Sequence, residues 1–412
     1  MEVRPGYKQT EVGVIPEEWN VRRLCSLANE ISDGIHTTPK YVTQSDFYFV
    51  NGNNLVNDEI VVAPTTMCVS EHEYKALRKP LTDQTLLFSI NGTIGNLAYY
   101  RGEKVVLGKS AAYINITRDI SKEFVAYCLK SRPTALFFEN ELTGTTIRNL
   151  SLQSLRNTPI PCPPTVKEQR AIATALSDVD ALLAKLDALI AKKRDLKHAA
   201  MQQLLTGQTR LPGFSGEWEV KKLGELANIC SGGTPSTTQP QFWNGNILWC
   251  TPTDITALNG HKYLKETSRR ITDQGLKYSS AEMIPSNSIV MTSRATIGEC
   301  ALNVVPVSTN QGFKNFVPFE NVHVEFLYYL LLTKKQSFIS LCGGSTFLEI
   351  GKNQLAIFEV RLPTAKAEQS AIATVLSDMD AEIAALVARR DKTRALKQGM
   401  MQELLTGRIR LV

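Results

Sequence analysis

The side chains that could do chemistry in this chain are suited to binding a polyanion. Phosphate oxygens accept hydrogen bonds from Ser, Thr, Lys and backbone N–H groups, and nucleic-acid base edges are contacted by Arg, Lys, Asn and Gln. Taken singly, each such residue could equally be a solvated surface side chain, but together they gather in turn-rich stretches of both halves. The residues predicted to contact the polyanion are His36, Thr37, Lys40, Tyr41, Arg78, Lys79, Asn91, Thr93, Lys109, Thr234, Ser236, Lys265, Arg269, Arg270, Ser293, Arg294 and Lys314.

Motifs of catalytic and metal sites are missing from the sequence. Residues 102–110 resemble a phosphate-binding P-loop, but five residues instead of four separate the glycines, and no clear strand precedes them. The signatures GxGxxG, GxSxG and HExxH are absent, and the five histidines are scattered. The eight cysteines include no CxxC pair, which favours free thiols in a reducing cytoplasm. We therefore predict no catalytic residue, no metal ligand and no cofactor held by this chain.

Composition narrows the class of protein further. With 43% hydrophobic and 21% charged residues, the 412-residue chain is not a largely disordered one. The longest apolar run, residues 326–332, is far shorter than the roughly 18–20 residues of a membrane span. The N-terminus lacks the apolar stretch of a secretory signal, so we expect a cytoplasmic protein without a membrane partner. A net charge of +6 permits a nucleic-acid ligand but does not demand one.

The sequence repeats itself at an interval of 200 residues. EQRAIATALSDVDA begins at Glu168, EQSAIATVLSDMDA begins at Glu368, and about 26 of the 44 residues that start at each glutamate are identical. The segment GFSGEWEVKKLGELA, which follows the first copy, resembles GVIPEEWNVRRLCSLA near the N-terminus. The order is circular, because the second copy ends at Val412 and the first repeat unit starts at Met1. We infer a pseudo-two-fold molecule whose termini lie close together.

Each copy of the strong repeat is typical of one long helix. Its apolar residues alternate at intervals of four and three, as in a coiled-coil seam. Thr165 with Glu168 fits a capping box, and Gly207 and Gly407 fit the C-terminal ends of the helices. A helix of about 40 residues, roughly 60 Å long, cannot bury one stripe inside a small domain, so we predict an antiparallel pair rather than two unrelated surface helices. The predicted interface contains Ile172, Leu176, Val179, Leu183, Leu186, Ile190, Ile372, Leu376, Met379, Ile383 and Leu386.

The second half of each helix is basic, and Lys193 and Arg390 fall on seam positions. Two interpretations stay open for these residues, a solvated face or a docking site for another protein or for phosphates. The basic residues are Lys192, Lys193, Arg194 and Lys197 in one helix, and Arg389, Arg390, Lys392, Arg394 and Lys397 in the other.

Two globular blocks remain, and the domains are predicted at 1–164 and 208–363, with the helices at 165–207 and 364–412. Both blocks mix short strand-like runs with turn signals and carry one late helix, at about 122–139 and 324–341. The fold class is therefore α+β, with two similar globular domains separated by two long antiparallel coiled-coil helices. The blocks diverge from each other while the helices do not, which favours two different ligands of one kind.

This arrangement closely resembles the specificity subunit of type I restriction–modification enzymes. The resemblance covers nearly the whole chain. It is carried by Glu168-Gln169 and Glu368-Gln369, by the following Ile-Ala-Thr-x-Leu-Ser-Asp, by the Leu-Leu-Thr-Gly ends, by Trp19 and Trp218, and by Asn310-Gln311-Gly312.

The resemblance implies a prokaryotic, non-catalytic subunit whose two domains each read one half of a bipartite double-stranded DNA target. The helices would fix the separation of the half-sites and dock two methyltransferase subunits. Those subunits would carry S-adenosylmethionine, and motor-nuclease subunits would bring ATP and magnesium chemistry. The alternatives are a two-headed protein scaffold without a DNA role, and an enzyme with an unrecognised site.

Overall fold

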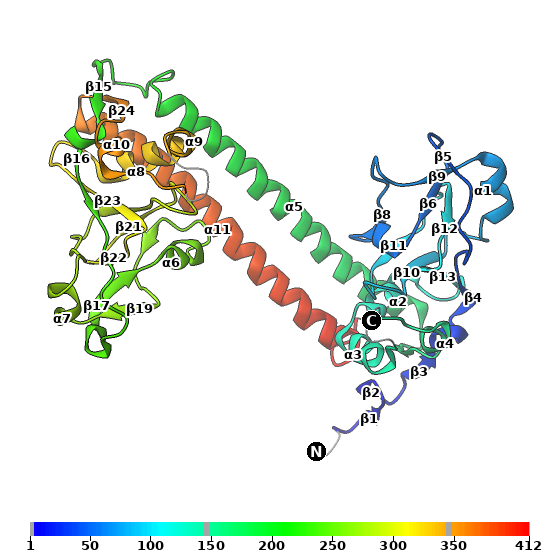
Figure 1. Ribbon diagram of the computed structural model, residues 1–412. Coiled ribbons are helices and arrows are strands. Elements are labelled where there is room, and N and C mark those ends of the chain that lie inside the picture. The colour runs from blue at the N-terminus through cyan, green and yellow to red at the C-terminus, as the bar shows by residue number, and fades with distance from the viewer. Residues whose placement is uncertain (1–3, 144–147, 343–347, 412) are drawn as a thin grey trace. The chain divides into compact units, whose positions relative to one another are not determined.

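The structure, a computed structural model, describes residues 4–143, 148–342 and 348–411, and the chain divides into two compact units. The first unit combines Met1–Asp187 with Ala388–Val412, so both ends of the chain belong to it, and the second is Ala188–Val387. Each unit holds one mixed α/β part, the N-terminal half of one long helix and the C-terminal half of the other (Figure 1). The predicted α+β class is confirmed.

In the first unit, an antiparallel four-stranded sheet in the order β11-β10-β13-β4 lies at the centre, with a second sheet in the order β12-β6-β9-β5. Its strands are β1 Tyr7–Thr10, β2 Gly13–Pro16, β3 Asn20–Arg23, β4 Ala28–Asp33, β5 Tyr41–Val42, β6 Tyr48–Val50, β7 Leu55–Val56, β8 Glu59–Ile60, β9 Cys68–Val69, β10 Thr85–Ser89, β11 Leu97–Tyr99, β12 Val105–Leu107, β13 Ala111–Ile116 and β14 Pro159–Cys162. Its shorter helices are α1 Glu71–Leu77, α2 Lys122–Leu129, α3 Arg132–Glu141 and α4 Leu152–Arg156.

The second unit has a five-stranded sheet in the order β16-β23-β20-β21-β18 and a three-stranded sheet in the order β19-β17-β22. Its strands are β15 Trp218–Lys222, β16 Ala227–Ser231, β17 Trp243–Cys250, β18 Tyr263–Leu264, β19 Arg269–Ile271, β20 Ser288–Thr292, β21 Cys300–Asn303, β22 Ser308–Thr309, β23 Phe313–Pro318 and β24 Glu359–Pro363. Its shorter helices are α6 Pro252–Ala257, α7 Asp273–Lys277, α8 Val324–Thr333, α9 Lys335–Ser340 and α10 Lys352–Ala356.

The prediction of one late helix in each block is wrong, because the structure has two shorter helices at each of these places. In the first unit α2 ends at Leu129, and the Ser131 hydroxyl accepts from the backbone N–H of Thr134 to start α3. Pro133 lies in the first turn of α3, where its missing N–H costs nothing. In the second unit the chain breaks at Lys334, between α8 and α9.

The two long helices are α5, Val166–Leu204, and α11, Lys366–Leu404. Within the first unit the start of α5 packs with the end of α11, and within the second unit the start of α11 packs with the end of α5. The helices are therefore antiparallel in each unit, as predicted. No helix in the described ranges is both long and apolar enough to span a membrane.

Each long helix ends three residues before its predicted glycine, and the glycine lies in the turn that follows. Gly207 and Gly407 have φ of +72° and +67°, a backbone conformation that favours glycine. A Cβ at Gly207 would come within 3.1 Å of the Trp218 ring, and one at Gly407 within 2.7 Å of Pro16. Each glycine therefore allows the turn after its helix, and it also allows close packing against Trp218 in one unit and Pro16 in the other.

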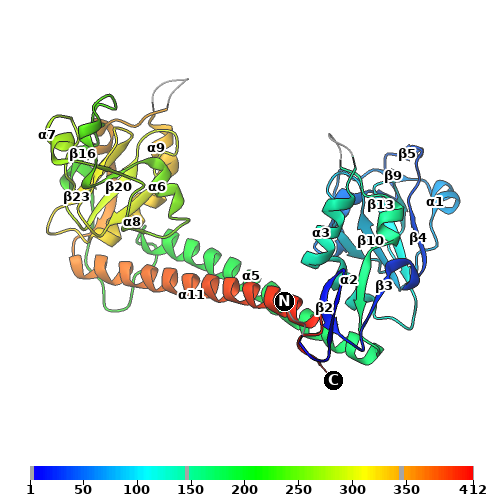
Figure 2. The ribbon, with the colours of Figure 1, turned by 90° about the horizontal axis from the view of Figure 1, so that it is seen from below.

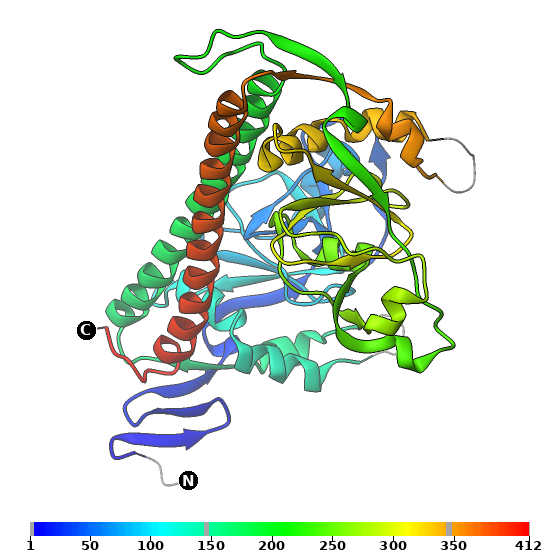
Figure 3. The ribbon, with the colours of Figure 1, turned by 90° about the vertical axis from the view of Figure 1, so that its left-hand side faces the viewer.

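The two ends of the chain meet in the first unit, as the circular order predicts. The Tyr7 hydroxyl donates to the backbone carbonyl of Gly407 at 3.4 Å, and Arg410 forms an ion pair with Glu18. Figure 2 shows the N-terminal strands beside the C-terminal end of α11. In the second unit the continuous segment after α5 turns back over the start of α11 (Figure 3), where Arg210 binds Glu368.

Candidate nucleic-acid interface

Three loops of the first unit are joined at one end of its central sheet. The first loop (34–40) follows β4 and is tied to the third loop (107–110) by a hydrogen bond of 2.7 Å from the N–H of Ile35 to the carbonyl of Leu107. The second loop (90–95) follows β10, and its Ile90 N–H donates to Ser110 at 3.0 Å. These bonds connect segments far apart in sequence into one surface.

The second unit builds the same surface from loops 232–238, 293–298 and 309–312. The N–H of Gly233 donates to the carbonyl of Thr309 at 2.9 Å, and that of Ser293 donates to Gly312 at 2.7 Å. Each bond matches one in the first unit, shifted by about 200 residues. We call these two sets of loops the three-loop surfaces.

A glycine in the first loop makes the close approach possible. A Cβ on Gly34 would overlap the carbonyl oxygen of Leu107, and a Cβ on Gly232 would overlap that of Asn310. No other residue fits where two backbones approach so closely. Both glycines therefore fix the frame, and the side chains beside them are free to differ.

In the first unit, six predicted contact residues lie on or beside the three-loop surface. The His36 ring, with a 69% exposed side chain, is 2.8 Å from the Asp33 carboxylate. Asn91 donates to the carbonyl of Lys109 at 3.3 Å, so the second and third loops are also joined through a side chain. Five of the six residues are exposed and Asn91 is half-buried; the six are His36, Thr37, Lys40, Asn91, Thr93 and Lys109.

The other three predicted residues of the first unit lie on the neighbouring sheet and helix. Tyr41 is on β5, and its ring packs edge-on against Phe49 with centroids 5.7 Å apart. Arg78 and Lys79 follow α1, which is tied to the first loop because Glu73 accepts from the N–H of Lys40 at 3.1 Å. They therefore extend the three-loop surface on one side.

In the second unit, Thr234 and Ser236 lie on the first loop and Arg294 on the second. Arg294 is held by Glu349 at 2.8 Å. Lys265 is exposed in the segment before β19. Arg270 is exposed on β19 itself and is paired with Glu266 at 2.8 Å. Arg269, on the same strand, lies over the ring of Trp243 at 3.8 Å from its centroid.

Burial contradicts the prediction for Ser293 and Lys314. Ser293 is fully buried, and its side chain points into the protein without a hydrogen-bond partner among the described residues. Lys314, which is 6% exposed, directs its ammonium to Glu349 at 3.5 Å. Neither side chain can reach a nucleic acid at the surface in this structure, so both are removed from the candidate set.

Two polar residues of the three-loop surfaces are absent from the contact residues predicted from the sequence. Gln311 is on the third loop of the second unit, where it accepts a hydrogen bond from Thr234 and occupies the place of Lys109. Asn51 accepts from the Ser110 hydroxyl at 2.8 Å and so supports the third loop of the first unit. Extending the repeat to the loops would have found Gln311, but nothing in the local sequence indicates the role of Asn51.

A buried carboxylate at the start of each long helix holds the frame. Arg210 binds Glu368 through two bonds of 2.5 and 2.7 Å, and the Glu368 side chain is 1% exposed. Arg410 binds Glu168 in the same two-pronged way. Glu168 also shows that the predicted capping box is half correct, because Thr165 caps its N–H at 3.2 Å while its carboxylate binds the arginine.

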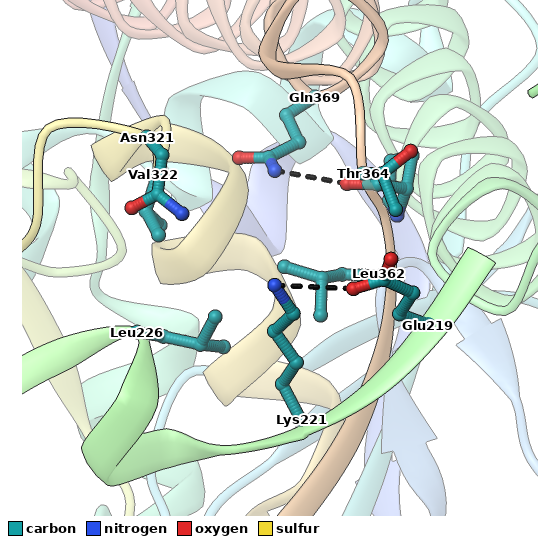
Figure 4. Close-up of a pocket in the computed structure, with 9 residues that line it drawn as sticks. Glu219, Lys221, Leu226, Asn321, Val322, Leu362, Thr364 and Gln369 are labelled. Atoms are coloured by element: carbon teal, nitrogen blue, oxygen red, sulfur yellow. Dashed lines mark hydrogen bonds and ion pairs between the residues drawn. The ribbon is translucent and has the colours of Figure 1, made fainter. Parts of the chain in front are cut away.

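The glutamine after each glutamate fastens the domain to the helix. Gln169 accepts from the N–H of Ser121 at 3.0 Å, and Gln369 accepts from that of His323 at 2.8 Å. Gln369 also donates to the carbonyl of Pro363 at 3.0 Å, as Figure 4 shows beside a small pocket. The Glu-Gln pair that opens each repeat is therefore structural.

The predicted helix interface is partly shared with the cores of the domains. Ile172 and Leu176 pack in the core of the first unit with Leu404, and Ile372 and Leu376 pack in that of the second unit with Leu204. The remaining members, Val179, Leu183, Met379, Ile383 and Leu386, are half-buried, while Leu186 and Ile190 are buried.

Several basic residues of the helices form ion pairs between the helices. In the second unit, Lys193 and Lys197 pair with Glu382 and Asp380 at 2.6 and 2.5 Å. In the first unit, Arg390 and Lys397 pair with Asp187 and Asp180 at 3.4 and 2.6 Å. Four of the basic residues left open by the sequence are thus part of the helix pairing.

Similarity to known proteins covers both units of the chain. The sequence model of the family described as type I restriction modification DNA specificity domain matches residues 16–192 and 215–392. The MjaIX specificity subunit of Methanocaldococcus jannaschii is 40% identical over 42% of this chain and 40% of its own length. The EcoR124I/EcoR124II specificity subunit of Escherichia coli is 30% identical over 63% of each chain. These matches span less than two thirds of the length of both relatives.

A solved structure shares the fold over nearly the whole length. The S subunit of a type I restriction-modification system from M. genitalium aligns with 98% of each chain at a TM-score of 0.59, with 17% sequence identity. The overall fold therefore recurs in a protein of distant sequence.

Proposed function

Because the chain belongs to the family of type I restriction modification DNA specificity domains and carries two copies, we propose that it selects the DNA target of such a system. The observation that carries the proposal is the pair of three-loop surfaces. Their backbone frames repeat, whereas equivalent side chains differ, as Lys109 and Gln311 do. Two equal frames with different side chains suit two different DNA sequences.

Each three-loop surface reads one half of a bipartite double-stranded target. The exposed amide, hydroxyl and basic groups on it are the donors and acceptors that base edges and phosphates require. The loops stand on sheets with fully buried strands such as β10, so the reading groups are carried by a rigid support.

The long helices set the distance between the half-sites and dock two methyltransferase subunits. Lys192 and Arg389 are exposed and, among the described residues, take no part in the ion pairs between the helices. The partner subunits supply S-adenosylmethionine and methyl transfer, and motor-nuclease subunits use ATP and magnesium for cleavage. In this assignment the chain itself is a non-catalytic, cytoplasmic protein of a prokaryote.

A footprint of the chain in complex with its methyltransferase subunits tests the proposal. We expect two protected blocks separated by an unprotected gap, with an affinity that falls steeply as salt rises, because phosphate contacts release counterions. One continuous protected block would contradict the two-half-site reading. Partner binding that is insensitive to both DNA and salt would instead favour the protein-scaffold alternative.

A further inference from the structure

An arginine on an aromatic platform adjoins the three-loop surface of the second unit. Arg269 is exposed, and its guanidinium lies 3.8 Å from the ring centroid of Trp243 and 5.2 Å from that of Trp249. The two indoles meet edge-to-face at a centroid distance of 5.0 Å. Stacking on an indole restrains the long arginine side chain and leaves its five N–H donors available at the edge of the plane.

The platform is tied directly to the first loop. The indole N–H of Trp249 donates to the carbonyl of Gly233 at 3.0 Å, and that of Trp243 donates to the carbonyl of Ser236 at 3.0 Å. Both indoles are at least 90% buried, so their position is fixed by packing as well as by these bonds. Arg269 is therefore held beside the loop that carries Thr234 and Ser236.

Arg269 differs from its neighbours in having no carboxylate partner within the described ranges. Arg270 is paired with Glu266, and Arg294 is paired with Glu349. A restrained guanidinium that is exposed beside the three-loop surface, without a carboxylate partner among the described residues, keeps its full capacity for a ligand.

The first unit places a different residue at the equivalent position. Phe49 on β6 corresponds to Trp249 on β17, since each pairs in parallel with the strand that leads into the third loop. On the neighbouring antiparallel strand, Arg269 lies opposite Trp249. The residue opposite Phe49 is Met67, whose carbonyl accepts a hydrogen bond from the N–H of Phe49 at 2.8 Å. Met67 is 49% exposed. The same place therefore holds a cation in one unit and an apolar side chain in the other.

We propose that Arg269 reads a guanine of the half-site bound by the second unit, through paired hydrogen bonds to guanine O6 and N7 in the major groove. This inference rests on the proposed function. Arginine is the side chain whose two parallel donors match these acceptors, and an apolar side chain such as Met67 cannot make the contact. The equivalent places occupied by Met67 in the first unit and Arg269 in the second are thus where the two units specify different bases.

The test uses the full chain in complex with its methyltransferase subunits and a panel of duplexes. Each base pair of the wild-type target is replaced in turn, and affinities are measured by competition. We expect the wild-type complex to lose roughly 10- to 100-fold when one G·C pair of one half-site is replaced. Arg269→Ala should abolish that preference and leave the other half-site unchanged, whereas the control Arg361→Ala, at an exposed arginine on β24 outside the candidate interface, should retain it.

Arg269→Met keeps an unbranched stem over Trp243 but has no N–H donor, like Met67 in the first unit, so it serves if the alanine variant fails to assemble. Loss of the G·C preference in the methionine variant supports base reading. Unchanged preference in both variants, or an equal loss of affinity for every duplex, overturns the inference in favour of no role or a phosphate contact. A wild-type footprint without two separate blocks would reject the proposed function instead.

Discussion

Single residues of the repeat have clear structural roles. Glu168 and Glu368 are both 1% exposed and each binds one arginine, which packs over Trp19 or Trp218. The sequence marks these glutamates by their identity in both copies but does not say what they bind. Their arginine partners lie just after the C-terminal end of the opposite helix, so the antiparallel pairing brings them together.

Replacing Glu368 by Gln should lower the free energy of unfolding by about 3 kcal/mol, because Arg210 is left without its buried counter-charge. Thermal or denaturant unfolding of the full chain measures this change. Asp83→Asn is the matched control, since its pair with Arg118 is 65% and 80% exposed and should cost less than about 1 kcal/mol. Equal losses in the two variants would contradict the role of the buried pair.

The stability of the second unit is expected to depend on pH through Glu325. Burial alone raises its pKa, but hydrogen bonds from Ser377 and Tyr263 and the charge of Lys262 outweigh burial and lower the pKa from its ordinary value of 4.5. A carboxyl with a lowered folded pKa stabilises the fold above its unfolded pKa, and this contribution disappears as pH falls through the folded pKa.

Melting curves between neutral and acidic pH should therefore show wild-type stability declining below the ordinary glutamate range. Glu325→Gln should be less stable at neutral pH and should decline less steeply in that window. Parallel pH profiles for the two proteins would show that Glu325 does not contribute.

At the scale of elements, periodic segments were predictable and loop assembly was not. The heptad pattern predicted both long helices, because apolar spacing depends only on local sequence. The break before α3 was missed although Ser131 and Pro133 both mark a helix start. The three-loop surface could not be predicted, since its bonds, such as Ile35 to Leu107, join loops that are distant in sequence.

Truncating Leu176 to Ala should cost about 2–5 kcal/mol of unfolding free energy, because the side chain is fully buried where α5 meets the core of the first unit. Leu196→Ala on the same helix is the control, since Leu196 is 47% exposed and should change stability little. Denaturant unfolding compares the two, and a control as damaging as Leu176→Ala would argue against the assignment of the buried face.

At the scale of the whole molecule, the circular order has a physical counterpart. The first unit is closed by contacts between the chain ends, such as Arg410 with Glu18, and the second unit by the continuous segment that carries Arg210. The two units therefore use the same contacts with different chain connectivity.

A circular permutant tests this equivalence. Joining the two ends of this chain by a short flexible linker and opening it after Gly213, in an exposed turn, should give a folded protein. Arg210 would then lie near the new C-terminus, as Arg410 does in the natural chain. We expect a melting temperature within a few degrees of the natural chain's, and failure to fold would mean that the two connections are not interchangeable.

The central claim, that two separate surfaces read two DNA half-sites, is tested most directly by mapping methylated bases in DNA from cells that carry the chain with its partner subunits. The wild type should yield one motif of two specified blocks separated by unspecified base pairs. Exchanging the first three-loop surface for that of a relative should change one block and leave the other intact. A single uninterrupted motif, or a change in both blocks, would contradict the account.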